Sequence, residues 1–545
     1  MPPATKPRRV PLLWILLPYA LGIGIARFIT LPEPWILILL SAVGIVFAYR
    51  SAGSAGVRWH CLAIISMVLL GAARFQNLHL DPGSQIAPIA REAQLELQVE
   101  TLFNATDPTT TLGLARVAKA PLQQKELTGL KIFFFLESAA LEHYPLEGER
   151  FSASGVVRTI PSYSEGDRFD AYLRNLGISH AYKQGYLLEK TGEARGLSQL
   201  ANRTKERFSH VLSQNKRPHG PFTGAYKGVM LGQKSELTPD QKQLFLANGT
   251  MHLFAISGLH IGVIAVCIHQ LLSLLRFKRC YRAMAALASI ACFVFITGGS
   301  ASSWRALLMV ACFYLTSFGY KQASPVNALA LSALVYLTLL PGQLFQAGFQ
   351  MSYFTVSAIL LFGLPLGKTL NELVPIFPNI PHPLQNNLQK GISIFKNWIL
   401  NAAGVSTAAF LISALLGIYY FQILPSYGIL INLIALPIAS LAIVAGFLSL
   451  LFSPVIEWIP ISELFNNAAL LLIKLIHGFL ELTSTLPFSS IETKPVSAYW
   501  AAAAILSSLA AITVSYSQSD IIRKRFWQLA TLTSCTLWIY ALLRV

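Results

Sequence analysis

The chain has 545 residues, of which 54% are hydrophobic and only 12% are charged. Because an ordinary soluble protein carries about 25% charged residues, this composition excludes a soluble globular protein and indicates a polytopic membrane protein. The six cysteines have neither the paired spacing of a zinc site nor the pattern of a disulfide framework. We therefore expect no metal and no cofactor.

Three apolar segments open the chain, at residues 10–30, 34–49 and 59–75. Each approaches the roughly 20 residues that cross the hydrocarbon core of a bilayer. No small-residue cleavage site follows the first segment, so we expect an uncleaved span rather than a signal peptide.

A polar stretch at residues 76–220 interrupts the apolar segments. Its alternating apolar positions, its aromatic and β-branched residues, and its Gly, Pro and Asp turns predict the strands of a small barrel or sandwich. An amphipathic helix is expected at 197–215, because apolar and basic residues occupy opposite faces. The strands are expected at residues 95–104, 112–122, 130–138 and 149–160.

Apolar segments return after this stretch, and with the first three they predict about 11–13 transmembrane helices. The first of them is short and re-entrant. They are expected at residues 222–233, 250–275, 283–298, 301–319, 324–340, 343–367, 397–421, 427–452, 463–485, 497–516 and 526–543. The expected parts of the chain are residues 1–75, 76–220, 221–455 and 456–545.

Basic residues in the loops predict the orientation, because cytoplasmic loops carry an excess of lysine and arginine. Lys6, Arg8 and Arg9 place the N-terminus in the cytoplasm, and three crossings then place residues 76–220 outside. Later clusters fall inside by the same count, provided that 222–233 does not cross. They are Arg50, Arg58, Arg276, Lys278, Arg279, Arg282, Lys321, Lys368, Lys390, Lys396, Arg523, Lys524 and Arg525.

The polar stretch holds 17 basic and 16 acidic residues, so almost the whole net charge of +17 belongs to the rest of the chain. The orientation rule explains most of this excess. It does not explain Lys227, Lys234, Lys242 and Arg305, which fall on the outer side of this scheme. An anionic substrate that enters from outside would meet them first.

The stretch Gly249–Gly262, GTMHLFAISGLHIG, places His252, Ser257 and His260 in a segment expected to lie in hydrocarbon. Polar side chains at membrane depth are costly, and they tend to face a protein interior or a wet cavity. Two interpretations remain open: the histidines line a path, or neighbouring backbone carbonyls satisfy them.

Glycine and proline positions predict close packing and helix breaks. Gly258 and Gly262 have the four-residue spacing that lets two membrane helices approach closely. Gly298 and Gly299 predict a break between two helices, and Pro437 predicts a kink.

The run LGQKSELTPDQKQLFLANGTMHLFAISGLHIGVIA at residues 231–265 resembles the signature of the ComEC family of competence proteins. The resemblance continues in order at 298–309, 341–358 and 425–439, and residues 169–178 resemble the end of that family's external domain. It implies an inner-membrane channel that passes single-stranded DNA into the cytoplasm during natural transformation. It also implies that 76–220 is an external OB-like domain and that 221–455 is the channel domain.

Three features depart from this family. Many members carry a C-terminal metallo-β-lactamase-like domain with an H-x-H-x-D-H cluster, and none of the eleven histidines forms that pattern. Some relatives have a cysteine pair in the external domain, and this chain has none there. Gln233 stands where the family usually has an acidic residue. Any nuclease linked to uptake is therefore expected on a separate protein.

Arg305 lies in ASSWRALLM, about 6 Å below the expected outer interface at 1.5 Å rise per residue. One interpretation is that it snorkels to that interface. The other is that its planar fork binds a phosphate at the channel mouth. Ser302 and Ser303 follow the expected break, and the N–H groups of a new helix start there would add a second phosphate site.

Other polar residues are candidates for the path or for catalysis. Ser257 and His260 are three apart, which suggests a nucleophile and base, but no third group is evident. Gln346 and Gln350 are expected to share a helix face. The DNA-path candidates are Arg305, His252, Ser257, His260, Gln346, Gln350, Ser352, Asn432 and Lys227, and no metal or catalytic residue is expected.

The external domain, if OB-like, offers aromatic residues on which single-stranded bases stack. Its nearly neutral charge predicts guidance of the strand rather than tight binding. The available aromatic residues are Phe133, Phe134, Phe135, Tyr163, Phe169, Tyr172 and Tyr182.

We thus expect a multi-pass protein of the bacterial cytoplasmic (inner) membrane that conducts DNA. Because the sequence contains no G-x-x-x-x-G-K-[ST] loop for binding ATP, we expect the energy for moving the DNA to come from a partner protein or from the membrane potential. The expected partners are single-stranded DNA, membrane lipid, a DNA receptor, a cytoplasmic motor or single-strand-binding proteins, and a separate nuclease. The alternatives are a secondary transporter of a small anionic solute and an intramembrane hydrolase.

Overall fold

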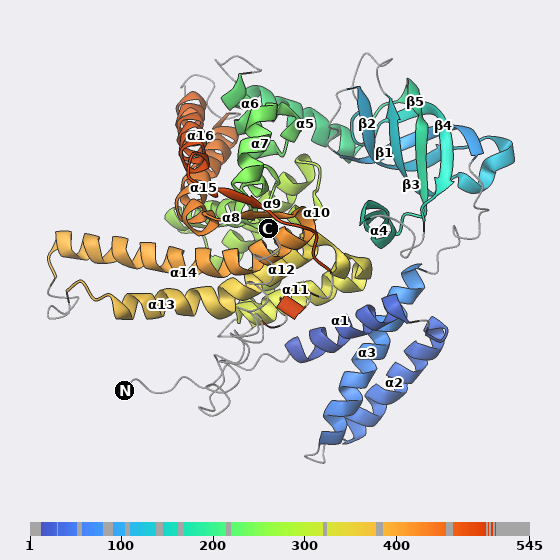
Figure 1. Ribbon diagram of the computed structural model, residues 1–545, viewed down its shortest axis with the longest axis horizontal. Helices are drawn as coiled ribbons and strands as arrows, with labels where there is room; N and C mark the ends of the chain where they lie inside the picture. Colours follow the sequence, from blue (N-terminus) through green and yellow to red (C-terminus); the bar gives the residue numbers. More distant parts are fainter. Residues whose placement is uncertain are drawn as a thin grey trace. The chain divides into compact units, whose positions relative to one another are not determined.

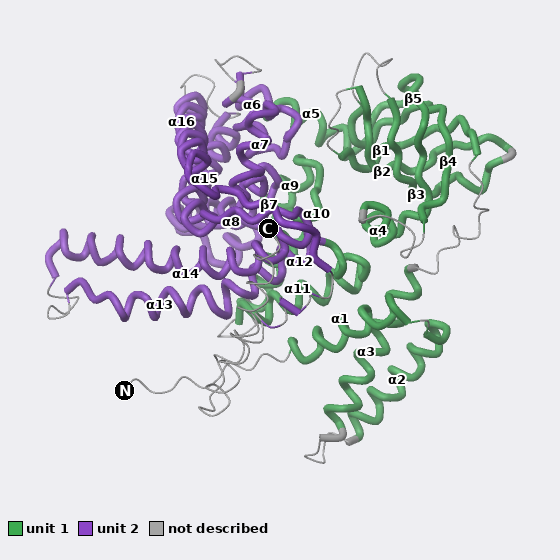
Figure 2. Tube along the Cα trace, in the orientation of Figure 1, with its two compact units in different colours: residues 1–208, 287–346 green, residues 209–286, 347–545 purple. Residues whose placement is uncertain are grey.

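The described residues form two compact units (Figure 2). Unit 1 comprises Met1–Phe208 and Leu287–Gln346, and unit 2 comprises Ser209–Ala286 and Ala347–Val545. Residues 287–346 therefore group with the N-terminal region rather than with the expected helical part at 221–455. The computed structural model describes residues 12–29, 31–51, 57–79, 91–103, 109–137, 145–161, 168–213, 220–319, 324–377, 385–453, 461–497, 500, 503, 504 and 507.

Unit 1 begins with three apolar helices, as predicted: α1 (Leu13–Phe28), α2 (Pro34–Ser51) and α3 (Val57–His79) (Figure 1). Two glycines let α1 and α3 approach closely. A β-carbon on Gly22 would lie 1.9 Å from the Val68 carbonyl oxygen, and one on Gly71 would lie 2.1 Å from the Tyr19 carbonyl oxygen. Small residues serve this purpose at membrane helix interfaces.

The polar insertion folds into a closed five-stranded barrel with the order β1-β2-β3-β5-β4. All neighbouring pairs are antiparallel except β3 and β5, which are parallel. A small barrel is one of the two arrangements that the strand pattern predicted. The strands are β1 (Arg91–Phe103), β2 (Thr110–Lys119), β3 (Lys131–Glu137), β4 (Arg150–Thr159) and β5 (His180–Gly192). The first four were predicted, and β5 was not.

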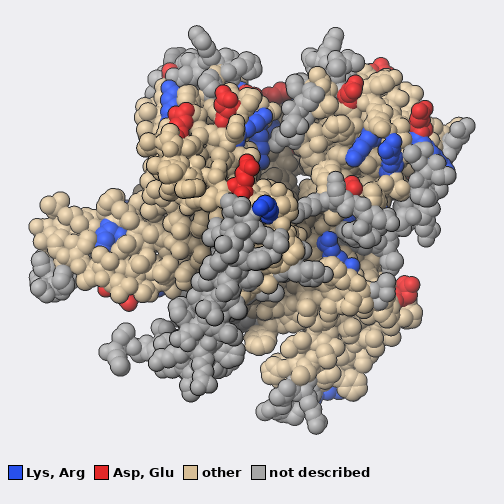
Figure 3. All heavy atoms as spheres, in the orientation of Figure 1, with Lys and Arg blue, Asp and Glu red and all other residues tan. Residues whose placement is uncertain are grey.

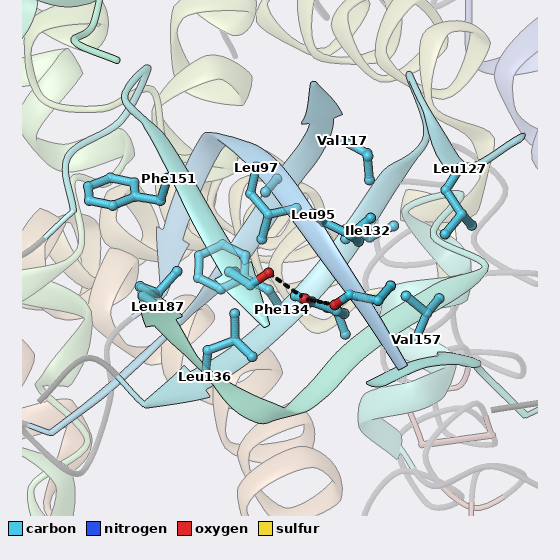
Figure 4. Packing of buried hydrophobic residues seen from close by; sticks show 14 of the residues in the cluster. Leu95, Leu97, Val117, Leu127, Ile132, Phe134, Leu136, Phe151, Val157 and Leu187 are labelled. Carbon is cyan, nitrogen blue, oxygen red and sulfur yellow. Dashed lines mark hydrogen bonds between the residues drawn. The ribbon is translucent and has the colours of Figure 1, made fainter. Parts of the chain in front are cut away.

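Successive residues of each strand point alternately into and out of the barrel, and the inward-facing side chains fill its core (Figure 4). Leu97 of β1 lies opposite Val117 of β2 and Phe151 of β4. The buried hydroxyl of Tyr182 lies 2.7 Å from the Ala93 carbonyl oxygen and 2.9 Å from that of Ala153. This bridge between β1 and β4 satisfies a polar group that burial would otherwise leave costly.

Several helices complete unit 1. The helix α4 (Arg168–Asn175) precedes β5, and α5 (Leu197–Leu212) follows it as the amphipathic helix that the sequence predicted. The others are η2 (Leu122–Leu127), α10 (Ala301–Gly319), α11 (Pro325–Leu339) and η5 (Pro341–Phe345), with α9 (Arg279–Ile296) divided between the two units.

Unit 2 is built from helices and one small two-stranded sheet, β6 (Ile423–Pro425) with β7 (Ser490–Glu492). A π-helical turn, η6 (Ile359–Gly363), joins α12 (Ala347–Ala358) to α13 (Leu364–Leu373). The remaining elements are α6 (Pro221–Leu231), η3 (Lys234–Glu236), α7 (Pro239–Ala247), η4 (Met251–Phe254), α8 (Gly258–Leu274), α14 (Asn387–Phe421), α15 (Gly428–Phe452) and α16 (Ile461–Ser484).

Six of the described helices are long and apolar enough to cross a membrane, and four shorter ones are apolar. On the face drawn in Figure 3, charged side chains are sparse over α1 to α3, α13 and α14, and they are more frequent over the barrel and over α6, α7 and α16. The predicted fold class, a polytopic helical membrane protein with an inserted β domain, is confirmed. The six spanning helices are Trp59–Leu78, Arg279–Ile296, Ala347–Leu373, Asn387–Phe421, Gly428–Phe452 and Ile461–Ser484.

Two predicted spans have different limits in the structure. The run 250–275 is not one helix, because η4 ends at Phe254 and α8 begins only at Gly258. The run 343–367 begins in η5 and passes through α12 and η6 into α13. Apart from a few residues, the spans predicted at 497–516 and 526–543 lie outside the described residues.

Candidate functional site

The short helix α6 of unit 2 is buried on all sides, from Thr223 to Leu231. Gly220 precedes it, Pro221 occupies its first turn, and Gly232 ends it in the left-handed conformation at φ 72°. Proline at the start and glycine just past the end are the usual helix limits. At 1.5 Å per residue its 11 residues extend only about 16 Å, too short to cross a bilayer.

Two glycines let other segments approach α6 closely. A β-carbon on Gly224 would lie 2.2 Å from the Glu236 carbonyl oxygen, and one on Gly228 would lie 2.9 Å from the Phe254 ring. The close packing expected at Gly258 and Gly262 is not observed, since a β-carbon on either has nothing within 4 Å. Two glycines four residues apart therefore allow close packing on α6, at Gly224 and Gly228, but not on α8.

Lys227 is the charged residue of α6, and only 5% of its surface is exposed. Its Nζ lies 3.5 Å from Oε1 of Glu236, whose side chain is 25% exposed. Glu236 is not among the candidate residues that the sequence suggested. The turn η3 instead returns it to α6, and so supplies a counter-charge to a buried ammonium.

A hydrogen-bonded chain fixes α6 within unit 2. The Tyr226 hydroxyl donates to Oδ1 of Asn466 on α16 at 2.9 Å, and Nδ2 of Asn466 donates to the Val211 carbonyl at 2.8 Å. Both side chains are fully buried, so the network orients the helix that carries Lys227.

Ser257 and His260 form the N-terminal cap of α8. The His260 ring nitrogen Nδ1 lies 3.3 Å from the Ser257 backbone nitrogen and 3.1 Å from its Oγ. His260 is fully buried, and its other ring nitrogen, Nε2, has no hydrogen-bond partner among the described residues. A hydrolase would need a group that orients this ring, so the pair is explained better as a reciprocal cap.

His252 lies before α8, in η4, and its Nδ1 is 3.0 Å from the Gly249 carbonyl oxygen. The imidazole is therefore held by its own turn. Of the two interpretations of the histidines, satisfaction by neighbouring backbone describes His252 in this structure.

Gln346 and Gln350 do not share a helix face, contrary to the prediction. Gln346 has an extended backbone between η5 and α12, and its amide donates to the Tyr172 carbonyl at 3.4 Å within unit 1. Gln350 lies in α12 and accepts from the Tyr420 hydroxyl at 3.0 Å within unit 2. Ser352 is half-buried on α12.

Asn432 and Pro437 both lie in α15. Asn432 is half-buried. The helix continues through Pro437 from Gly428 to Phe452, so the proline does not end it.

Arg305 is buried in unit 1, with 3% of its surface exposed. Its guanidinium carbon lies 5.9 Å from the centre of the Tyr336 ring. Burial raises the pKa of Tyr172 on α4, Tyr336 raises it further, and the charge of Arg305 lowers it. The guanidinium is therefore covered by protein near two tyrosines, which argues against snorkelling to a surface.

The predicted break between α9 and α10 is present, with positive φ angles at Gly298 and Gly299. A carboxylate approaches this turn: a β-carbon on Gly298 would lie 3.2 Å from Oε2 of Glu147. Burial raises the pKa of Glu147, although Lys205 and the Leu102 backbone lower it. The expected second phosphate site at this helix start therefore has a carboxylate of the chain itself beside it.

Comparisons with known proteins connect this geometry to a family. The model of a family described as competence protein matches residues 229–518, more than half of the chain. The chain belongs to the competence protein family. A match of this extent supports a role in competence, and it includes η3, α8 and the last three residues of α6.

This competence protein is similar to "ComE operon protein 3" of Bacillus subtilis (strain 168). The two are 28% identical over 153 residues, which are 28% of this chain and 20% of the relative. The aligned part thus spans one fifth of that relative's length. No solved structure matches.

Three of the seven aromatic candidates in the barrel domain of this competence protein are buried, each at most 2% exposed. Phe134 and Tyr182 belong to the barrel core, and Phe133 belongs to a second cluster with Leu173 and Ile178. Phe135 is 44% exposed, and Phe169 is 38% exposed although its ring also contacts those of Phe133 and Tyr172, so both present some ring surface to the outside. Tyr163 lies outside the described residues. Among the residues that the structure describes, no group of His, Cys, Asp and Glu is arranged to hold a metal ion.

Proposed function

We propose that this competence protein passes single-stranded DNA across the cytoplasmic membrane during natural transformation. The observation that carries the proposal is the family match over 229–518, which contains five of the six helices long enough to cross a membrane and begins two residues after the buried Lys227. A polyanion that crosses an apolar layer needs compensating charge inside the protein. Lys227 is the candidate within unit 2 that meets this need.

The proposed orientation has the N-terminus in the cytoplasm and the barrel outside. The basic clusters at the loop ends support it, because they follow the positive-inside bias. A periplasm-active reporter fused near Gly129, in the turn before β3, should be bright, and one near Lys278 should be dark. The reverse pattern at either site would remove the external position of the barrel.

The barrel would guide the strand rather than hold it. Its exposed aromatic residues Phe135 and Phe169 support weak, sequence-tolerant stacking. Its nearly neutral charge limits the number of phosphates that it neutralises. A DNA receptor, a cytoplasmic motor or single-strand-binding proteins, and a separate nuclease would supply capture, work and strand degradation.

A deletion strain tests the function directly. Labelled DNA should accumulate outside the cytoplasmic membrane of this strain and fail to enter the cytoplasm, and transformation should be lost. A plasmid copy of the gene should restore both. Normal DNA entry in the deletion strain would contradict a channel and would favour transport of a small anionic solute.

A further inference from the structure

We propose that Lys227 binds a backbone phosphate of the moving strand and that Glu236 is the counter-ion which it exchanges for that phosphate; this inference rests on the proposed transport function. The pair would then have a closed state, in which the carboxylate neutralises the ammonium, and a transport state, in which a phosphate does so.

The burial of the pair is the first argument. Lys227 is nine-tenths or more buried in a helix that nothing but protein surrounds. A buried ion pair contributes little net stability, because desolvation offsets the attraction, and apolar residues of similar volume serve as well. An ionisable residue inside a membrane protein is therefore first considered a functional residue with its partner.

The unequal exposure of the two side chains is the second argument. The Lys227 side chain is 6% exposed and the Glu236 side chain is 25% exposed. An anion that approaches from the accessible side meets the carboxylate first and reaches the ammonium only after the carboxylate turns aside. Glu236 thus stands between Lys227 and the accessible side.

The backbone around the pair shows which part would move. Close contact with Gly224 holds the backbone of Glu236 against α6, and Tyr226 is tied to Asn466. The exchange therefore needs only a rotation of the Glu236 side chain, with α6 and η3 in place. Gly232, at φ 72°, gives the short connection between them its sharp turn.

The chemistry of a lysine suits a strand that slides. An ammonium is a point charge without a fixed fork, so it binds successive phosphates without regard to base sequence. The returning carboxylate would release each phosphate, which prevents the strand from being trapped by a single strong contact. No bond is made or broken in this exchange.

Three variants separate this exchange from a structural ion pair, with transformation normalised to protein amount in the membrane. Lys227→Gln should lower transformation about tenfold or more, the loss expected for one charge-assisted contact. Glu236→Gln should also lower transformation, but with labelled DNA retained at the membrane, because the lysine still binds phosphate and no carboxylate returns to release it. The double variant Lys227→Glu, Glu236→Lys keeps an ion pair, so it should accumulate normally and still fail to transport.

The control is Lys119→Gln, which breaks an ion pair of 3.3 Å on the exposed barrel surface and should change nothing. If Lys227→Gln fails to accumulate in the membrane, the double variant, which keeps an ion pair, is the one that tests whether transport needs a lysine at position 227. Transport restored by the charge swap, or normal transport by Lys227→Gln, would overturn the exchange. DNA entry that persists in the deletion strain would instead overturn the transport function itself.

Discussion

The two buried basic residues of this protein have different surroundings. Arg305 of unit 1 lies over the ring of Tyr336, near Tyr172 of the helix that precedes the last barrel strand. Lys227 of unit 2 lies beside a carboxylate that is partly accessible. Both are at most 5% exposed.

We interpret Arg305 as a structural cation and Lys227 as an exchangeable one. Aromatic rings contribute attraction and packing to a planar guanidinium. A carboxylate can be replaced by another anion of the same charge. From sequence, Arg305 was the first choice for a phosphate ligand. We propose Lys227 for that role instead, and we expect Arg305 to connect α4 with α11.

The largest effect is expected at Gly224. Gly224→Ala adds a β-carbon 2.2 Å from a backbone carbonyl of η3, so the segment that presents Glu236 must shift. Because the opposing atom belongs to the backbone, this overpacking should cost at least about 3 kcal/mol, the upper end of its usual range, and thermal unfolding in detergent measures it. The matched control is Gly262→Ala, which lies in open space within a helix and should gain up to about 1 kcal/mol. Equal tolerance of both changes would contradict the close packing on α6.

Arg305→Ala should cost at least about 2 kcal/mol, because a desolvated cation–aromatic contact and its packing are lost. Transformation should then fall only as far as protein amount falls. Arg305→Lys should recover part of the stability, since an ammonium lacks the planar stack. If Arg305→Ala accumulates normally but loses transformation, the result would contradict the structural role and indicate that Arg305 lies on the DNA path.

Ser257→Ala removes the side-chain half of the α8 cap and should cost about 1 kcal/mol. DNA transport per molecule should remain unchanged, because Ser257 is not a nucleophile in this account. Loss of transport at full protein amount would support the hydrolase hypothesis and contradict the cap.

The smallest effect is expected at Glu147. Burial raises the pKa of this carboxyl above its ordinary value of 4.5, so the folded protein binds the proton more tightly than the unfolded chain. The stability that this contributes is complete below the unfolded-state pKa and is lost as pH rises through the folded-state pKa. Glu147→Gln should therefore become more stable than the wild type as pH rises from about 4.5 to neutrality. A stability difference independent of pH would refute the shift.

The sequence predicted the elements of the fold more completely than the contacts of the site. Alternating residues predicted β1 to β4 because a strand repeats every two residues, and long apolar runs predicted most spans. The strand β5 was missed, as its second half is mostly polar, from Lys183 to Gly192.

The site depended on contacts that spacing does not encode. Gly224 and Gly228 have the same spacing as Gly258 and Gly262, and only the neighbouring segments decide which pair packs closely. Likewise, Lys227 and Glu236 are nine residues apart, and it is the turn after Gly232 that joins them. A lysine followed by glycine and a short acidic turn is the signal that would have suggested the pair.

Photocrosslinking during DNA uptake tests the central claim most directly. A photoreactive amino acid is placed at Ser235, the exposed neighbour of Glu236, or at Trp304, the exposed neighbour of Arg305. Cells that import labelled single-stranded DNA are then irradiated. The account predicts a DNA adduct at position 235 that appears only during uptake, and no adduct at 304. An adduct at 304 with none at 235 would contradict it.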